Sequence, residues 1–298
     1  MIKLIVSDMD GTLLNEQMEI SDANASAIKR AQNEGIHFAI ATGRDFPSAS
    51  PIVNKHGIVC PLILSNGAEF FNTDGDKLYN RGLEKNMVRN ILSILSTEDT
   101  LHTELVTTNG LYTVDKSGRI NMVASLLTDV NPDITFEEAR ELAHEKITDI
   151  NLHQVDSFDA VLEDDRVIIL KVTTHSMKGK EVLTPIKDEL NNTIPHLAVT
   201  ASSTSNLEIN HEKATKGIAV AQLAKTLGLK ADEVMTIGDN INDVSMLEWA
   251  DYSVAMENAA PEAKAAANYS TSSNRHNGVA EVISRVLSGS IYKKAVNF

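Results

Sequence analysis

Residues 7–15 read SDMDGTLLN and follow the apolar run from Ile2 to Val6. We expect that run to form a strand, in which side chains alternate between faces, so that Asp8 and Asp10 point to the same side. Two carboxylates held this close repel each other and raise each other's pKa unless a cation lies between them. A hard divalent cation is a suitable counter-charge. An Asp-Gly pair after a strand is also a common turn signal, so the other stretches of the chain must decide.

The composition is that of an ordinary globular chain, with 298 residues, 42% hydrophobic and 23% charged. A formal net charge of −14 argues against a nucleic-acid or anionic-membrane partner, since both favour clustered Lys and Arg. The single cysteine, Cys60, excludes an intrachain disulfide and is typical of a reducing compartment. The sequence also lacks a signal-peptide pattern and an apolar run long enough to span a bilayer. We therefore expect a cytoplasmic protein.

Short apolar runs alternate with helix-like segments at both ends of the chain, which predicts a parallel sheet covered by helices on both faces. The polar ends of the strands then line one edge, where open α/β sheets place their ligands. The expected strands are 2–6, 38–41, 62–64, 234–237 and 252–255, and the expected helices include 23–33, 216–227, 244–249 and 279–287. The tail from Gly289 has no periodicity, and we expect it to be poorly ordered or a minor packing element.

The middle of the chain has a different rhythm, in which hairpin signals mix with helices. Asp74-Gly75 and Asn109-Gly110 each lie between strand-like runs, and Thr135 with Glu138 makes a capping box for a helix. We therefore predict a Rossmann-like α/β core domain with an inserted α+β cap domain. The predicted bounds are residues 1–83 and 211–298 for the core and 84–210 for the cap.

Four polar clusters fall at strand ends or helix starts of the predicted sheet domain. They are Asp8 to Thr12, Thr42 to Arg44, Lys216, and the stretch GDNIND from Gly238 to Asp243. If they converge, four carboxylates meet few fixed positive charges, and such a group is unstable without a cation. Mg²⁺ suits it, because this ion takes oxygen ligands and commonly bridges to a phosphate.

Several of these residues also have ordinary structural interpretations. Asp239 and Asp243 would serve as a turn and the N-cap of the next helix, and Lys216 would serve as a solvated surface lysine. A cation at a helix N-terminus is locally unfavourable, however, unless an anion lies between the two. Thr42 and Gly43 offer a hydroxyl and an unobstructed N–H suited to phosphate oxygens, although a simple strand-to-helix turn explains them equally well.

Taken in order, DMDGT, Thr42-Gly43-Arg44, Lys216 and GDNIND resemble the four motifs of the haloacid dehalogenase-like superfamily. The GD-x-x-ND form and an insertion after the third strand resemble the Cof-type sugar-phosphatase branch. The resemblance implies Mg²⁺-dependent hydrolysis of small phosphate monoesters, such as sugar phosphates, through an aspartyl-phosphate. It also implies that the inserted domain closes over the site and selects the substrate.

The same resemblance implies the role of each residue. Asp8 would be the nucleophile and Asp10 the general acid and base, with a pKa above that of the metal-bound Asp8. Thr12 would help orient Asp10, and Lys216 would complete the catalytic set. The metal ligands would be the Asp8 carboxylate, the Asp10 carbonyl and Asp239, with Asp243 behind them in contact with the ligands and not with the ion. The phosphate would be held by the Met9 N–H, Thr42, Gly43, Arg44, Lys216 and Asn242.

Two alternatives to a hydrolase stay open at this point. The same site would support a phosphomutase if a sugar, rather than water, received the phosphoryl group. The chain would also serve as a catalytically idle Mg²⁺- or phosphate-binding module acting through partners, although the intact Asp10 argues against that. The identity of the substrate, the cap residues that contact it and the oligomeric state cannot be derived from the sequence.

Overall fold

The structure is a computed structural model that describes residues 1–130, 133–147 and 151–292. The chain divides into two compact units. Unit 1 comprises Met1–Asn80 with Ala214–Phe298, and unit 2 comprises Arg81–Lys213. The predicted fold class, a parallel-sheet α/β domain with an inserted α+β domain, is confirmed.

Unit 1 is built on an eight-stranded sheet in the order β14-β13-β12-β1-β2-β3-β4-β5. Neighbouring strands from β14 to β3 run parallel, whereas β4 and β5 form an antiparallel hairpin at one edge. In the centre of the sheet, Val6 pairs with Ala39 on one side and with Thr236 on the other. The strands are β1 Leu4–Ser7, β2 His37–Ala41, β3 Leu62–Leu64, β4 Glu69–Phe71, β5 Lys77–Asn80, β12 Val234–Gly238, β13 Tyr252–Met256 and β14 Tyr269–Thr271.

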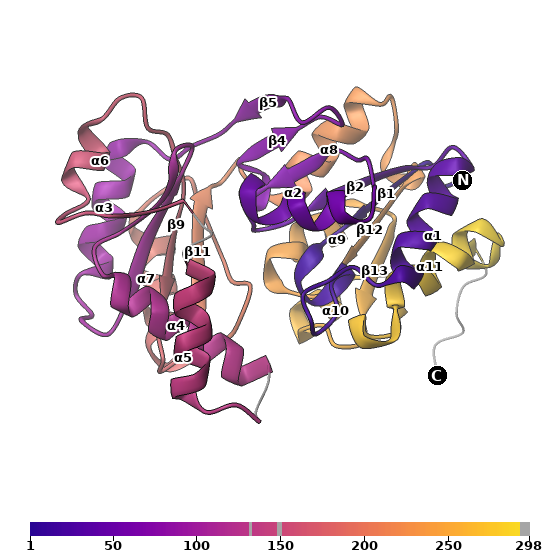
Figure 1. The fold of residues 1–298 in the computed structure, drawn as a ribbon. Helices are drawn as coiled ribbons and strands as arrows, with labels where there is room; N and C mark the ends of the chain where they lie inside the picture. Colours follow the sequence, from indigo (N-terminus) through magenta and orange to yellow (C-terminus); the bar gives the residue numbers. More distant parts are fainter. Residues whose placement is uncertain (131–132, 148–150, 293–298) are drawn as a thin grey trace. The chain divides into compact units, whose positions relative to one another are not determined.

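Helices cover both faces of this sheet, because alternate strand residues are buried on opposite sides. Ile5 packs in one cluster with α1, α2 and α11, whereas Leu4 and Val6 pack in another with α8. Figure 1 shows α1 beside α11. The helices of unit 1 are α1 Asp22–Asn33, α2 Phe46–Lys55, α8 Lys216–Thr226, α9 Val244–Trp249, α10 Pro261–Ala266 and α11 Gly278–Leu287. Short helical turns occupy Met9–Leu13, Ser65–Gly67, Ala231–Glu233, Ile241–Asp243, Asn274–His276 and Ser290–Tyr292.

Local signals explain where elements of unit 1 begin and end. The side chain of Ser21 caps α1 by accepting a hydrogen bond of 3.1 Å from the Asn24 N–H, a role for which serine is well suited. At the other end of the chain, Ile291 is buried in the core cluster, so the start of the tail packs on unit 1. Residues 293–298 lie outside the described part of the chain.

Unit 2 contains a six-stranded sheet in the order β10-β11-β9-β6-β7-β8, antiparallel except for the β7–β8 pair. The helices α3 and α7 pack their apolar sides on this sheet in one hydrophobic cluster. The strands are β6 His102–Thr107, β7 Gly110–Thr113, β8 Leu152–Gln154, β9 Ile169–His175, β10 Leu197–Thr200 and β11 Asn206–His211. The helices are α3 Lys85–Leu95, α4 Lys116–Val130, α5 Phe136–Ile147, α6 Asp159–Glu163 and α7 Lys180–Thr193.

Two local predictions in unit 2 are confirmed. The Asn109-Gly110 signal joins the antiparallel strands β6 and β7. At the start of α5, the Thr135 N–H donates to Glu138 at 2.8 Å while the Glu138 N–H donates to the Thr135 hydroxyl at 3.3 Å, which is the expected capping box. The helix α4 was not predicted from the sequence; it packs against α5 through a small cluster that includes Ala124 and Ala139. Among the described helices, none has both the length and the apolar character that a membrane crossing requires.

Candidate active site

The site of interest lies at the carboxyl edge of the unit 1 sheet. Because β12, β1, β2 and β3 are parallel neighbours, the residues that follow them meet at this edge. Asp239 follows β12, Asp8 follows β1, Thr42 follows β2 and Asn66 follows β3. The strand order thus brings together polar stretches from both halves of the sequence.

Lys216 occupies the centre of a buried ion cluster. Its ammonium group donates to Asp8 Oδ1 and to Asp243 Oδ1, each at 2.6 Å, and its side chain is 0% exposed. The lysine opens α8, which the Thr215 hydroxyl caps by accepting from the Ile218 N–H. Burial alone would lower the pKa of Lys216, but Asp243 and Asp8 raise it above its ordinary value. The two carboxylates therefore favour the charged form of the lysine that lies between them.

Asp243 uses both carboxylate oxygens within the protein. While Oδ1 accepts from Lys216, Oδ2 accepts from the N–H groups of Asp239, at 2.8 Å, and Asn240, at 3.0 Å. These bonds fix the loop after β12 and leave Asp243 engaged with the chain. The expected place of Asp243 behind the metal ligands stays a prediction.

Asp239 is held by the turn that follows β1. The Thr12 hydroxyl donates to Asp239 Oδ1 at 2.6 Å. Gly11 has φ +81°, and a Cβ on this residue would lie 2.3 Å from Asp239 Oδ2, so only glycine fits. The expected role of Thr12 was to orient Asp10; its hydroxyl instead contacts Asp239, because the left-handed turn at Gly11 carries Thr12 to that carboxylate.

Asp10 and Arg44 form a two-point ion pair. The Arg44 Nε donates to Asp10 Oδ2 at 2.8 Å and Nη2 donates to Oδ1 at 2.6 Å. A third bond runs from Nη1 to the Ser48 carbonyl at 3.2 Å. The sequence grouped Arg44 with the phosphate-binding residues, whereas its guanidinium here holds the proposed acid and base. This fork matches the planar geometry of a carboxylate.

The remaining predicted phosphate-binding residues also lie at this edge. The Met9 side chain is buried in the core, so only its backbone is available to a ligand. Thr42 is buried, and its hydroxyl accepts from the Arg44 N–H at 3.2 Å, with Gly43 between them in the chain. Asn242 is buried, and its side-chain amide donates to Asn66.

The carboxylates of the site are costly to bury without a cation. Burial and then Asp243 raise the pKa of Asp8 well above its ordinary value, although Lys216 lowers it. The same two causes raise the pKa of Asp239 to about 7, against lowering effects of Thr12 and Lys216. Oxygen atoms of Asp8, Asp239 and Asp243 lie within 4.8 Å of one another. This all-oxygen donor set fits a hard divalent cation.

The sequence did not assign a role to two asparagines at the site. Asn66 accepts from Asn242, and the Asn258 side chain donates to the Gly11 carbonyl at 2.8 Å. The one available signal was the position of Asn66 two residues after the third predicted strand of the sheet. Asn258 follows β13 in a loop that carries no motif.

Comparison with known proteins agrees with this geometry. The family described as haloacid dehalogenase-like hydrolase matches residues 5–283. The chain belongs to this family. The Bacillus subtilis (strain 168) phosphatase YwpJ is 30% identical over 288 residues, which cover 96% of this chain and 100% of YwpJ. Another protein of that organism, 5-amino-6-(5-phospho-D-ribitylamino)uracil phosphatase YwtE, is 31% identical and covers 97% of this chain and 99% of its own.

Solved structures of the family have the same fold. A haloacid dehalogenase-like hydrolase from B. subtilis superimposes with a TM-score of 0.85 at 28% identity, covering 96% of this chain and 100% of its own. The family resemblance predicted from the four motifs is thereby confirmed. The chain is an enzyme of the haloacid dehalogenase-like phosphatase group.

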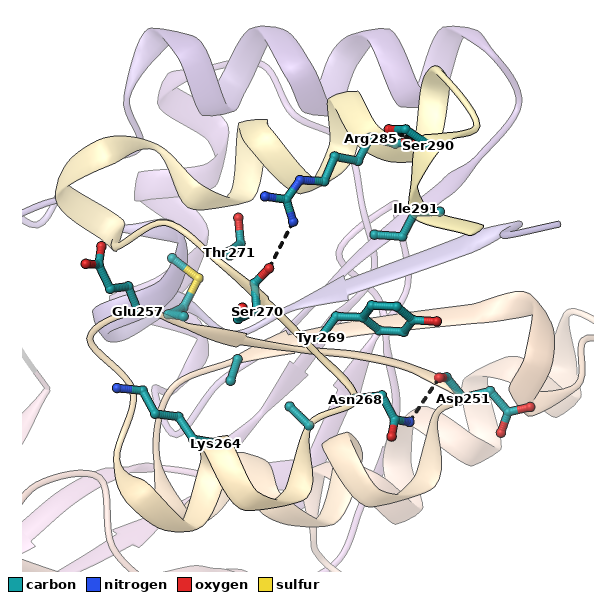
Figure 2. Close-up of a pocket in the computed structure, with 13 residues that line it drawn as sticks. Asp251, Glu257, Lys264, Asn268, Tyr269, Ser270, Thr271, Arg285, Ser290 and Ile291 are labelled. Atoms are coloured by element: carbon teal, nitrogen blue, oxygen red, sulfur yellow. Dashed lines mark hydrogen bonds between the residues drawn. The ribbon is translucent and has the colours of Figure 1, made fainter. Parts of the chain in front are cut away.

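This hydrolase also has a hollow of about 1190 Å³ beside β14, the strand at one side of the sheet. Figure 2 shows its lining, in which Arg285 and Asn268 donate to the backbone carbonyls of Ser270 and Asp251. Among the described residues that line it, none belongs to the predicted catalytic set. The predicted catalytic residues therefore do not line this hollow.

Proposed function

We propose that this protein is a Mg²⁺-dependent phosphatase that hydrolyses small phosphate monoesters through an aspartyl-phosphate on Asp8. The buried cluster of Asp8, Lys216, Asp243 and Asp239 is the observation that carries this proposal. It combines a carboxylate suited to nucleophilic attack, a fixed positive charge and an oxygen donor set. The named phosphatases among the relatives support the same reaction class.

Residues of unit 1 would hold the metal. We assign its direct ligands to the Asp8 carboxylate, the Asp10 main-chain carbonyl and Asp239, with Asp243 supporting them through the Asp239 N–H. When bound, Mg²⁺ would polarise the phosphoryl oxygens and offset the charge of the carboxylates. The left-handed turn at Gly11 and the Thr12 hydroxyl would keep Asp239 directed at the ion.

The first chemical step belongs to Asp8 and Asp10. One Asp8 oxygen attacks phosphorus as the bond from phosphorus to the ester oxygen breaks, and Asp10 gives its proton to the departing oxygen. In the second step Asp10 takes a proton from a water molecule, which attacks the same phosphorus and releases inorganic phosphate and free Asp8. The Arg44 fork occupies both oxygens of ionised Asp10, so it would orient Asp10 between the two transfers and open at one oxygen while Asp10 carries the proton.

The phosphate oxygens need donors around them, and the loops at the sheet edge provide several kinds. We assign this role to a fixed charge, a hydroxyl, a carboxamide and main-chain N–H groups. They are Lys216, Thr42, Asn242 and the N–H groups of Met9 and Gly43, with Arg44 contributing when it releases Asp10.

The substrate belongs to the small phosphorylated metabolites in this proposal. One relative is named for a phosphorylated ribitylaminouracil, which combines a sugar-alcohol phosphate with a pyrimidine. We propose that unit 2 selects among such compounds and that the enzyme works in the cytoplasm. A panel of sugar phosphates, nucleotides and flavin or pyridoxal phosphates, ranked by kcat/KM, would identify the preferred class.

Asp8→Asn tests the reaction itself, because it keeps the shape of the side chain and removes its nucleophilic charge. We expect turnover of an aryl phosphate to fall by at least ~10³-fold. Asp22→Asn, the same change at an exposed position in the first turn of α1, is the matched control and should keep normal turnover. EDTA should suppress activity and added Mg²⁺ should restore it. Near-normal turnover by Asp8→Asn, or activity independent of metal, would contradict the proposal.

A further inference from the structure

The turn Ser65–Gly67, directly after β3, has an unusual backbone for a buried segment. Ser65, Asn66 and Gly67 have φ values of 50°, 61° and 101°, so three consecutive residues are left-handed. All three are buried. A non-glycine residue in this region costs about 1–2 kcal/mol, and such strain persists only where the surroundings impose it. The position of this turn at the carboxyl edge of the sheet suggests that the surroundings are those of the site.

Backbone contacts tie the turn to two other loops of the site. The Asn66 N–H donates to the Thr42 carbonyl and the Ser65 N–H donates to the Arg44 carbonyl, each at 2.9 Å. A Cβ on Gly67 would lie 2.6 Å from the carbonyl oxygen of Thr215, the residue before Lys216. The turn therefore packs between the loop after β2 and the start of α8.

The Asn66 side chain contacts a further loop of the site, the one that follows β12. Its Oδ1 accepts a hydrogen bond of 3.2 Å from Asn242 Nδ2, and both residues are buried. A carboxamide has two N–H donors at one end and an acceptor oxygen at the other. With one N–H directed to Asn66, the orientation of the Asn242 amide is fixed, and its second N–H is left for another acceptor.

We propose that Asn66 is a positioning residue that holds the Asn242 carboxamide so that an N–H, and not the oxygen, faces the phosphoryl group. This inference rests on the proposed function, in which Asn242 binds a phosphate oxygen. Without the acceptor on Asn66, the amide of Asn242 is free to turn, and its oxygen would then repel an anion. The left-handed backbone serves this role because it aims the Asn66 side chain at Asn242 while its N–H bonds to Thr42.

Asn66→Gly is the appropriate variant, because glycine accepts the positive φ and lacks the carboxamide. Binding of inorganic phosphate to the full chain with Mg²⁺ would be measured by calorimetry. We expect its Kd, and its inhibition constant in turnover, to rise ~10-fold, the effect of one hydrogen bond to a charged group. A purely structural defect would lower the binding stoichiometry and kcat while leaving Kd unchanged. If the glycine variant does not fold, Asn66→Ser, which also lacks the carboxamide oxygen, should give the same rise.

A double-mutant cycle identifies the residue through which Asn66 acts. In an Asn242→Ala background, Asn66→Gly should change the phosphate Kd by less than about twofold, since the group that it positions is gone. Asn277→Gly is the matched control: Asn277 also has a positive φ of 58° and a carboxamide oxygen that accepts from a neighbour, Ser21. That variant should bind phosphate as the wild type does.

The two proposals fail in different ways. If Asp8→Asn keeps its turnover, the proposed function is wrong. If Asp8→Asn is inactive but Asn66→Gly binds phosphate within about twofold of the wild-type Kd, only the role of Asn66 is wrong. Equal effects of Asn66→Gly with and without Asn242 would also overturn that role.

Discussion

Removing the Lys216 charge should destabilise unit 1 more than any surface change. The ammonium lies 2.6 Å from both Asp8 and Asp243 with no exposure to solvent, so Lys216→Met leaves two buried carboxylates unpaired. Breaking a buried ion pair by removing one partner costs ~3–5 kcal/mol, and here two partners lose the same cation. We expect a loss of unfolding free energy at or above that range. Turnover should fall at least ~100-fold, as for other lost transition-state donors.

Urea unfolding measures this loss of unfolding free energy. EDTA is present so that no metal ion offsets the charges of the buried carboxylates. Trp249, the single tryptophan, lies at the end of α9 in unit 1 and makes fluorescence a reporter of that unit. Lys225→Met, at an exposed position of α8, the helix that Lys216 opens, is the control and should change stability by less than ~0.5 kcal/mol. Adding Asp243→Asn to Lys216→Met should recover part of the loss. If Lys216→Met unfolds at the same urea concentration as Lys225→Met, the account of the buried cluster is wrong.

Three further predictions concern single positions. Gly11→Ala, which places a Cβ 2.3 Å from Asp239 Oδ2 at φ +81°, should cost ~1–3 kcal/mol and weaken Mg²⁺ binding in calorimetry; unchanged binding would contradict the close approach. Arg44→Lys keeps the charge but not the two-point fork on Asp10, so kcat/KM should fall ~10-fold or more, and full activity would refute the orienting role. In unit 2, burial lowers the pKa of His175 from 6.5 to about 4, so the unfolded chain binds the proton first as pH falls. Stability of β9, followed by amide hydrogen exchange, should therefore be full above pH 6.5 and fall by ~3 kcal/mol towards pH 4, and His175→Gln should remove most of that dependence.

The backbone of the site could be predicted because short loops follow buried parallel strands. Once β1, β2 and β12 are neighbours, Asp8, Thr42 and Asp239 must meet at one edge, whatever their side chains do. The spacing of the apolar residues predicts these buried strands. A parallel sheet made of such strands then places the motif residues of unit 1 in one cluster.

The contacts between those loops could not be predicted. Whether the Thr12 hydroxyl reaches Asp10 or Asp239 depends on the left-handed turn at Gly11, and a glycine allows many conformations. The pairing of Arg44 with Asp10 depends on rotamers of two long-range partners. Asn66 stands in a Ser-Asn-Gly stretch that is typical of any turn, so its bond to Asn242 has no sequence signal of its own.

The central claim is that Asp8 carries the phosphoryl group, and trapping that species tests it most directly. The wild-type enzyme would be mixed with Mg²⁺ and an aryl phosphate, quenched in acid during turnover and digested for mass spectrometry. We predict a phosphoryl group on the peptide that contains Asp8, and none on the same peptide of Asp8→Asn. Turnover with the phosphoryl group on another residue, or an active Asp8→Asn variant, would contradict the account.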